Sequence, residues 1–449
     1  MITSPKRSFG ETHSEQALGI LVAGALHGVW RKSLPAISNL KSPISDVSSP
    51  ISDLGSQISD LRSQMPEESL SEETLSLITP LLYASGSAAL GWWRIRNSEL
   101  AGSAPGVLLH DAYRRSRLNA LIHEREIKHV LSLLRAAGIE PILVKGWAIA
   151  RHYPDHALRP YGDIDLCIRP DQFSQAEAAL KCLETIDGHY VDLHHGFGKF
   201  TWHGRPARVR TKESTVNRVE YSARRHGQDA HATFVWHELF ERSQIVMLGE
   251  TSVRVLSAED HLRVLCLHLL RSGAWRPVWL CDIALAVESR PANFDWARCL
   301  GTDPLVAKWL SCTIGLAHQL LGADVNAPNN KFGIRNSQFA IPHWLAPAVL
   351  RQWGRAKGPS ETEMLLPALI RNIGLPSVMF RELRARWDRP VVASFKLRAP
   401  LNNFPRAPYQ LADLLLRSAQ LPAQSALMLR EQLKRFRFES FRRPAASEH

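Results

Sequence analysis

The stretch that decides the fold is residues 144–168, which read VKGWAIARHYPDHALRPYGDIDLCI. It ends in Asp163–Ile168, where apolar and polar residues alternate as in a strand with one buried face. Because side chains two positions apart on a strand point to the same side, Asp163 and Asp165 share one face. Two neighbouring carboxylates repel each other unless a cation lies beside them, and such oxygen ligands suit Mg²⁺. The stretch therefore predicts a divalent-metal site, and Gly162 leaves room for a ligand to approach.

A positively charged element precedes these carboxylates. Residues 142–144 read as a short buried strand, and Lys145-Gly146 begins an element that we expect to be a helix to about Tyr153. The free amides at a helix start attract phosphate, and Lys145 adds a full positive charge. Arg159, in the loop before the acidic strand, is placed to reach the same polyphosphate. Two alternatives stay open: Lys145 as an exposed lysine at a strand end, and Arg159 as a brace for the carboxylates.

A third carboxylate follows on the next predicted strand, His189–His194. In its alternating pattern Val191 and Leu193 face the core, which turns Asp192 and His194 to the opposite side. If this strand pairs with the first acidic strand, Asp192 joins Asp163 and Asp165 around the metal.

Other polar residues nearby receive no ligand role. Asp187 stands next to a glycine in the turn before the strand, where turn chemistry alone explains an Asp. Glu213 and Glu220 lie in an aperiodic segment that offers no rigid element to hold a ligand. His194 and His195 are expected to orient the site or pack rather than act as a base, since a metal activates the hydroxyl.

Three carboxylates beside a phosphate-binding element predict nucleotidyl transfer with two Mg²⁺ ions. One ion would lower the pKa of an attacking hydroxyl, and the other would hold the triphosphate of an NTP and stabilise the departing pyrophosphate. The sequence does not name the acceptor or the base of the NTP.

Residues 137–168 closely resemble the signature of a bacterial family of largely uncharacterised nucleotidyltransferases of the DNA polymerase beta superfamily. The matching motifs are KG at 145–146, RPYGDID at 159–165, and an acidic-Leu-His at 192–194. The resemblance extends over 255–284, which looks like the family's helical region. It implies an α+β nucleotidyltransferase fold, a small mixed sheet with helices on one face, followed by a mainly helical C-terminal domain. The superfamily's usual Gly-Ser at the helix start is Lys-Gly here.

The chain of 449 residues is long enough for two or three domains. We expect a helical N-terminal region over 1–105, a nucleotidyltransferase core over 106–256, and a helical C-terminal domain with a basic tail over 257–449. A low-complexity heptad repeat occupies 37–64, and a basic insert at 199–232 interrupts the core.

The net charge is +12, from 55 Lys and Arg against 43 Asp and Glu. Nine of these excess charges lie in two short stretches, 199–232 and 430–443, which lack a regular pattern of stacking aromatics. Because the rest of the chain is nearly balanced, the charge is weak evidence for nucleic-acid binding. A small molecule or a protein is the favoured acceptor.

The cysteines and apolar runs favour a cytoplasmic protein. None of the six cysteines forms a CxxC pair, which argues against a zinc ribbon or a redox dithiol and indicates buried thiols in a reducing compartment. The apolar run 17–26 is too short to cross a bilayer, and Pro80, Gly86 and Gly91 interrupt the run 77–95. We therefore expect no membrane span.

The sequence also allows a non-catalytic binding module and contains a spacing found in RNases. A catalytically inactive nucleotidyltransferase fold that serves as a binding module, such as an antitoxin-like partner, is the alternative to an enzyme. Arg263 and His268 have the R-x4-H spacing of an RNase motif, but such spacings arise often by chance in an Arg-rich chain, and packed core histidines explain them better.

The repeat at 37–64 generates a first testable prediction. Ile and Leu or Val recur at heptad spacing as in a coiled coil, yet Pro43 and Pro50 break a helix. Replacing 37–64 by a short Gly/Ser linker should change the melting temperature little, because loop closure costs grow only logarithmically with length. A large loss of stability, or dissociation of an oligomer on a sizing column, would instead support a coiled coil.

Overall fold

The structure is a computed structural model that describes residues 11–32, 70–160, 162–181, 190–197, 236–325, 339–355, 377 and 389–419. The repeat 37–64, the insert 199–232 and the tail 430–443 lie outside these residues, as do Asp187, Glu213 and Glu220. The described residues belong to two compact units. One holds those up to 355 together with 400–403, and the other holds 377, 389–399 and 404–419.

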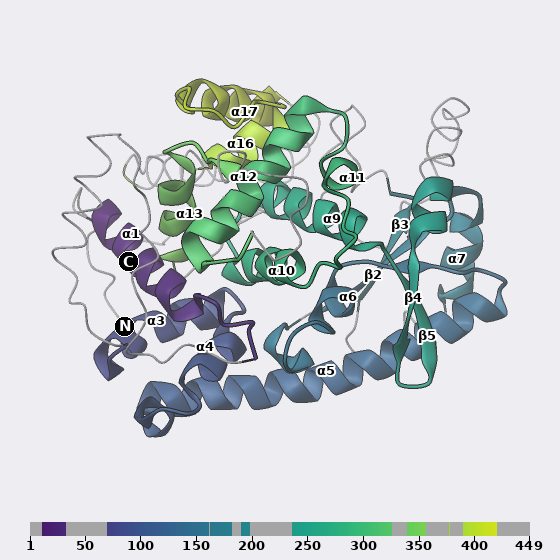
Figure 1. Cartoon of the computed structure of the whole chain (residues 1–449), viewed down its shortest axis with the longest axis horizontal. Coiled ribbons are helices and arrows are strands. Elements are labelled where there is room, and N and C mark those ends of the chain that lie inside the picture. The colour runs from purple at the N-terminus through teal and green to yellow at the C-terminus, as the bar shows by residue number, and fades with distance from the viewer. Residues whose placement is uncertain are drawn as a thin grey trace, which may run out of the picture. The chain divides into compact units, whose positions relative to one another are not determined.

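The strands of the first unit form a mixed sheet, seen in Figure 1 around the labels β2, β3, β4 and β5. The five described strands lie in the order β3-β2-β1-β5-β4. Strand β2 pairs parallel with β3, β1 pairs antiparallel with β2 and parallel with β5, and β4 pairs antiparallel with β5. The bounds are Ile142–Leu143 for β1, Asp163–Ile168 for β2, Tyr190–His195 for β3, Gln244–Leu248 for β4 and Thr251–Val255 for β5. The predicted α+β class is confirmed, with β3 displaced by one residue from its expected position.

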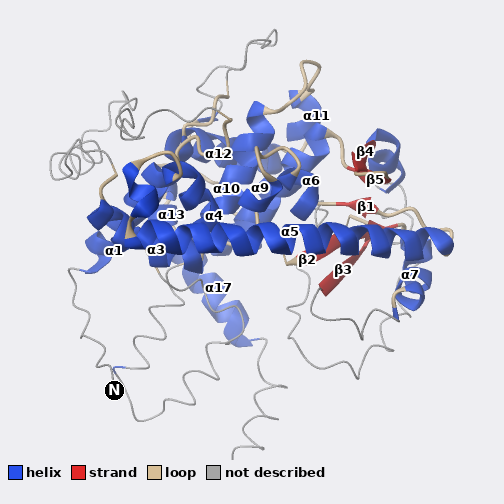
Figure 2. Cartoon of the chain, turned by 90° about the horizontal axis from the view of Figure 1, so that it is seen from below, coloured by secondary structure: helices blue, strands red, loops and turns tan. Residues whose placement is uncertain are grey.

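A long helix, α5 (Ala104–Ala136), runs beside the sheet (Figure 2). The Ser103 side chain caps its start by accepting a hydrogen bond from the Gly106 amide. Gly138 follows its end with a positive φ of 72°, a conformation that glycine adopts without strain. The apolar residues of 107–137 recur with helical spacing and Gly138 follows them, a pattern that is typical of such a helix.

Both faces of the sheet are buried. On one face, side chains of β1, β2, β3 and β5 pack against α5 and α7 (Phe173–Ala179). On the other face, a smaller cluster joins Cys167 of β2 to residues of the segment 236–242 and to Val264 of α9 (Ala258–Arg271). The alternation of β2 therefore places its apolar residues in one core and its polar residues on the side of the smaller cluster.

The remaining described elements are helices. Among the described elements, α1, α3, α4 and the short η2 precede α5, and every one after β5 is helical, as predicted for the C-terminal part. The elements are α1 (Glu11–Leu26), α3 (Glu72–Ala84), α4 (Ala88–Ile95), η2 (Glu99–Gly102), α6 (Gly146–Ala150), η3 (His156–Leu158), η4 (Pro170–Gln172), α10 (Pro277–Glu288), α11 (Trp296–Leu300), α12 (Pro304–Leu321), α13 (Leu345–Trp353), and in the second unit α16 (Pro390–Lys396) and α17 (Ala407–Ala419).

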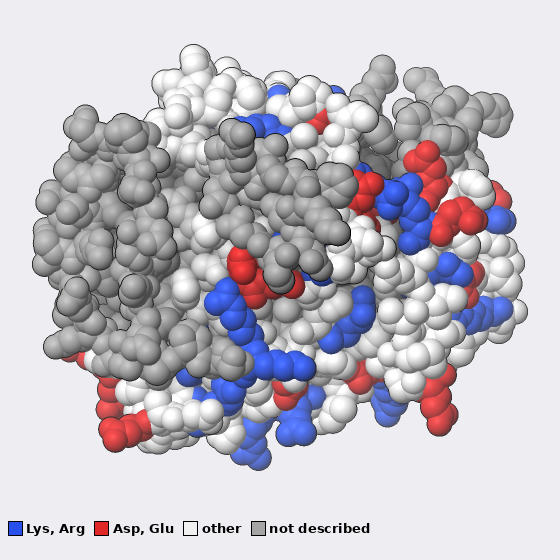
Figure 3. All heavy atoms as spheres, in the orientation of Figure 1, with Lys and Arg blue, Asp and Glu red and all other residues white. Residues whose placement is uncertain are grey.

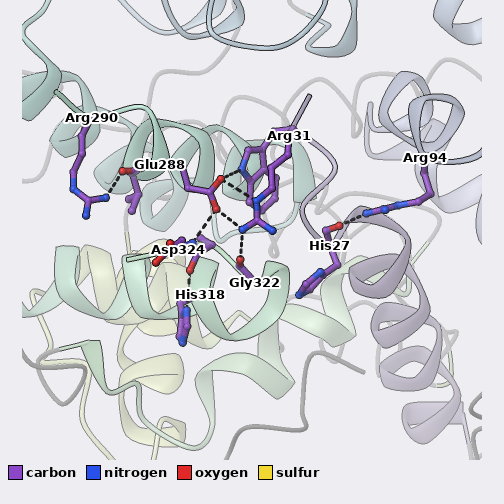
Figure 4. A network of polar contacts seen from close by, with 11 residues as sticks. His27, Arg31, Arg94, Glu288, Arg290, His318, Gly322 and Asp324 are labelled. Atoms are coloured by element: carbon purple, nitrogen blue, oxygen red, sulfur yellow. Dashed lines mark hydrogen bonds and ion pairs between the residues drawn. The ribbon is translucent and has the colours of Figure 1, made fainter. Parts of the chain in front are cut away.

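One carboxylate, Glu288, ties the segment after α1 to the helices that follow the sheet (Figure 4). It accepts hydrogen bonds from the Trp30 indole at 2.8 Å, from the Arg31 guanidinium, and from the Asp324 amide at 2.8 Å. Arg31 also donates to the carbonyl of Gly322 at 2.7 Å. These bonds fix the C-terminal end of α10 against the end of α12 and the N-terminal segment.

The described surface carries charges of both signs. Figure 3 shows Lys and Arg side chains gathered near the centre of one face, with Asp and Glu beside them and around its edge. In the described part of the chain, no helix combines the length and apolar character needed to cross a membrane. The domain boundaries at 105 and 256 stay predictions.

Helix α1 lies so close to α13 that only glycine fits at their contact. A Cβ on Gly19 would lie 1.9 Å from the backbone oxygen of Leu350, whereas a Cβ on Gly24, in the same helix, would meet no atom within 4 Å. We expect Gly19→Ala to lower the free energy of unfolding by about 2 kcal/mol, because the two backbones must separate. Gly24→Ala should raise it by up to about 1 kcal/mol through helix propensity. Chemical denaturation of both variants checks this, and equal effects would contradict the packing.

Candidate active site

The polar faces of β2 and β3 meet at one place. In their parallel pairing Asp165 lies directly opposite Asp192, and Cys167 lies opposite His194. Because register partners on neighbouring strands point to the same face, the two carboxylates and the imidazole converge. One ligand atom from each of Asp165, Asp192 and His194 lies within 4.8 Å of the others. The structure thus brings Asp192 to Asp165, as the strand register predicted.

Asp165 is the centre of this cluster. Its residue is 4% exposed, and its Oδ1 accepts a hydrogen bond from His194 Nε2 at 2.9 Å. The Lys145 ammonium lies 2.6 Å from the same oxygen. Asp192 is more accessible, with its side chain 30% exposed and its Oδ2 at 3.5 Å from His194 Nε2. His194 therefore links both carboxylates, as expected of a residue that orients the site.

The charge of Asp165 is stabilised despite its burial. Burial raises the pKa of a carboxyl group, but the hydrogen bond from His194 and the charge of Lys145 outweigh it and lower the pKa of Asp165 to about 2. The pKa of Asp163 shifts the other way: partial desolvation and repulsion by Asp165 raise it, although Lys145 and Arg159 offset part of the effect. A cluster that holds one carboxylate ionised beside others is suited to bind a cation.

Asp163 itself stands apart from the three clustered residues. It is the first residue of β2 and lies at the exposed end of the strand. Its backbone oxygen accepts a hydrogen bond from Nε2 of His123, a buried residue of α5, at 3.2 Å. A Cβ on neighbouring Gly162 would meet no atom within 4 Å, so the space beside Asp163 is open on that side.

Lys145 reaches Asp165 through a strained turn. Strand β1 pairs with β2, and the Val144 amide donates to the Asp165 carbonyl at 3.0 Å, which brings the next residue beside the carboxylate. Lys145 has a φ of 56°, and Gly146 also has a positive φ. A non-glycine residue in this region is costly and is found most often at functional sites. The following helix, α6, ends at Ala150, so it is shorter than predicted.

Arg159 forms an ion pair with a residue that lies far away in the sequence. Its guanidinium donates to Asp282 Oδ2 from Nε at 3.1 Å and from Nη2 at 3.0 Å, and Tyr153 donates its hydroxyl to Asp282 Oδ1 at 2.9 Å. Asp282 lies on α10 and is fully buried. In the hydrogen bonds of the described residues, Arg159 thus binds none of Asp163, Asp165 and Asp192, and instead braces the loop before β2 against α10.

Sequence reasoning gave Asp282 no role. The available signal was a lone acidic residue inside the apolar helix VWLCDIALAV, since a buried carboxylate almost always has a cationic or hydrogen-bonding partner. That pattern predicts that Asp282 has a partner but does not identify the partner.

Two further histidines that the sequence singled out, His195 and His268, pack against aromatic rings. His195 packs against the Phe173 ring at 5.3 Å between centroids, on the α7 side of β3. His268 packs edge-on against Trp279, and burial lowers its pKa to about 3. Arg263 donates instead to the carbonyls of Cys299 and Leu300. Arg263 and His268 are thus engaged separately, as the packed-histidine interpretation predicts. The described cysteines are buried, as expected.

Comparison with known proteins gives one match. A family model described as an uncharacterised nucleotidyltransferase matches residues 76–322, more than half of the chain. That span begins within α3, contains the whole described sheet and ends just after α12. No curated protein and no solved structure matches the chain.

The buried pair of Arg159 and Asp282 generates a stability prediction. Asp282→Ala should lower the free energy of unfolding by about 3–5 kcal/mol, because it leaves a guanidinium buried without its partner. The matched control is Asp171→Ala, which removes the partner of Arg169 in a pair whose side chains are 62% and 47% exposed. That change should cost about 1 kcal/mol or less. Denaturant titration of both variants measures the difference, and equal costs would refute the bracing role.

Proposed function

Since the chain belongs to the uncharacterised nucleotidyltransferase family, we propose that it transfers a nucleoside monophosphate from an NTP to an acceptor hydroxyl, with pyrophosphate leaving. The observation that carries the proposal is the register of β2 and β3, which holds Asp165 and Asp192 side by side next to Lys145. The motifs at 145–146, 159–165 and 192–194 also support placement in the DNA polymerase beta superfamily.

The donor atoms fit a divalent metal. Asp163, Asp165 and Asp192 offer carboxylate oxygens, which Mg²⁺ prefers, whereas imidazole suits softer metals. His194 therefore serves better as the hydrogen-bonding residue that orients Asp165 and Asp192 than as a ligand. Bound Mg²⁺ ions, two in our proposal, would lower the pKa of the acceptor hydroxyl and neutralise charge on the triphosphate.

The protein groups around the carboxylates have separate tasks in this proposal. Lys145 is close enough to Asp165 to bind a phosphate oxygen of a substrate held there, and the turn at Gly146 presents its backbone beside that phosphate. Gly162 leaves the approach to Asp163 open. Arg159 steadies the loop before β2 from its bond with Asp282, and its charge acts on Asp163.

The rest of the chain is assigned by extension. We propose a nucleotidyltransferase core over 106–256, preceded by a helical region over 1–105, and a helical domain over 257–449 that shapes the acceptor pocket. A small molecule or a protein is the proposed acceptor, and the cytoplasm is the proposed compartment. The base of the NTP stays open.

The carboxylates generate the decisive activity test. The full chain is incubated with each labelled NTP, Mg²⁺ and cell extract, and the labelled product is isolated. Asp163→Asn, Asp165→Asn and Asp192→Asn should each lower the Mg²⁺-dependent transfer by roughly 10³-fold or more, because metal-bound charge stabilisation is worth several kcal/mol.

Asp171→Asn is the matched control, since Asp171 is exposed just beyond the other end of β2 and should leave the transfer unchanged. Unchanged transfer in Asp165→Asn and Asp192→Asn would reject the site. A folded wild-type protein that labels no acceptor with any NTP would favour the non-catalytic binding module instead.

A further inference from the structure

Arg276 stands at the start of α10 between two tryptophans. Its guanidinium carbon lies 5.0 Å from the ring centroid of Trp275 and 5.5 Å from that of Trp279. The two indoles meet edge to face, with centroids 5.8 Å apart. All three residues are half-buried. A guanidinium held on two rings has a restricted orientation, so it is a preorganised cation.

Arg276 differs from the other arginines that lie over aromatic rings in the described residues. Each of the others donates a side-chain hydrogen bond: Arg31, Arg96, Arg115, Arg254, Arg290 and Arg406. The guanidinium of Arg276 makes no hydrogen bond or ion pair with the described residues, and its Nε is buried without an acceptor. An unsatisfied buried donor on a charged group is costly. We therefore expect Arg276 to bind an acceptor that the described residues do not supply.

Two observations place Arg276 near the loop that carries the carboxylates of β2. A Cβ on Gly86 would lie 3.5 Å from Nη2 of Arg276 and 3.8 Å from Cγ of Pro160, so the guanidinium is near the loop that leads into β2. On its other side Trp279 packs on His268, a residue within electrostatic range of Lys145 and Asp165.

The surroundings of Arg276 also disfavour its positive charge. Burial and the nearby charge of Arg159 lower the pKa of Arg276, while Asp163 is the opposing charge that raises it. The charge of Arg159 is already matched by Asp282. An anion bound beside Asp163 would relieve this repulsion and satisfy the donors of Arg276.

We infer that Arg276, oriented by Trp275 and Trp279, binds the triphosphate of the NTP. The inference rests on the proposed function and gives the phosphate-binding task, which the sequence suggested for Arg159, to a second arginine. A triphosphate is the favoured anion because it must lie against the metal carboxylates, and Arg276 lies near Pro160 in the loop that leads to Asp163. Trp275 and Trp279 are positioning residues, since they act on the phosphate only through the guanidinium.

The test uses inorganic tripolyphosphate with Mg²⁺, because this probe carries the phosphates without a base. Isothermal titration calorimetry on the full chain should show that Arg276→Gln weakens tripolyphosphate binding by roughly 10- to 100-fold, the range for hydrogen bonds to a charged group. Arg276→Lys should weaken it less, because the charge is kept. The matched control is Arg290→Gln, which removes an arginine from the ring of Trp296 at 5.3 Å, away from the cluster. That variant should keep the affinity of the wild type even if its melting temperature falls.

The outcomes test the role of Arg276 and the proposed function separately. Wild-type affinity in Arg276→Gln, or a wild-type protein that does not bind tripolyphosphate, overturns the inference. If Arg276→Gln keeps its tripolyphosphate affinity and instead raises the KM for the acceptor, Arg276 contacts the acceptor and the inference is wrong. If the wild type transfers nucleotide in either case, the proposed function stands. If the wild type binds tripolyphosphate through Arg276 but transfers no nucleotide from any NTP, the proposed function fails while the anion-binding role of Arg276 is upheld.

Discussion

The parallel pairing of β2 with β3 is the constraint on which the rest of the site depends. It fixes Asp165 opposite Asp192, and two carboxylates on one face of a sheet are unfavourable unless positive groups accompany them. Lys145 supplies a positive charge and His194 a hydrogen bond in the described structure, and the strained backbone at Lys145 shows that the fold accepts a local cost to deliver the ammonium. The apolar residues of the same strands are buried on the opposite face, so the register cannot slip without exposing them.

Helix α10 connects this site to the helical part of the chain. Its start carries Arg276, its middle carries Asp282, and its end carries Glu288, which binds the segment after α1. Asp282 holds Arg159 and therefore the loop that leads into β2. By holding Arg159, the helix supports the loop that leads into β2. The family match from residue 76 to residue 322 covers this helix as well as the sheet.

The sequence predicted what depends on local pattern. Alternation in β2 and β3, together with the expected pairing of the two strands, placed Asp165, Asp192 and His194 on one face. What depends on contacts between distant residues was not predictable. Arg159 and Asp282 are 123 residues apart, so the sequence could not decide between phosphate binding and bracing. The sequence did not predict a role for Arg276, because an arginine before a proline indicates only the start of a helix. That the described residues offer its guanidinium no acceptor is visible only in three dimensions.

In the proposed function, Asp165 and Asp192 hold the metal of a nucleotide substrate. A crystal structure of the chain with Mn²⁺ and a non-hydrolysable NTP analogue tests it most directly, because Mn²⁺ is located by its anomalous scattering. We predict a manganese peak at about 2.0–2.3 Å from a carboxylate oxygen of both residues, the usual range for small divalent cations, with the triphosphate between Lys145 and Arg276. A structure in which the analogue or the metal binds elsewhere, and the ion pair of Lys145 with Asp165 persists unchanged, would contradict it.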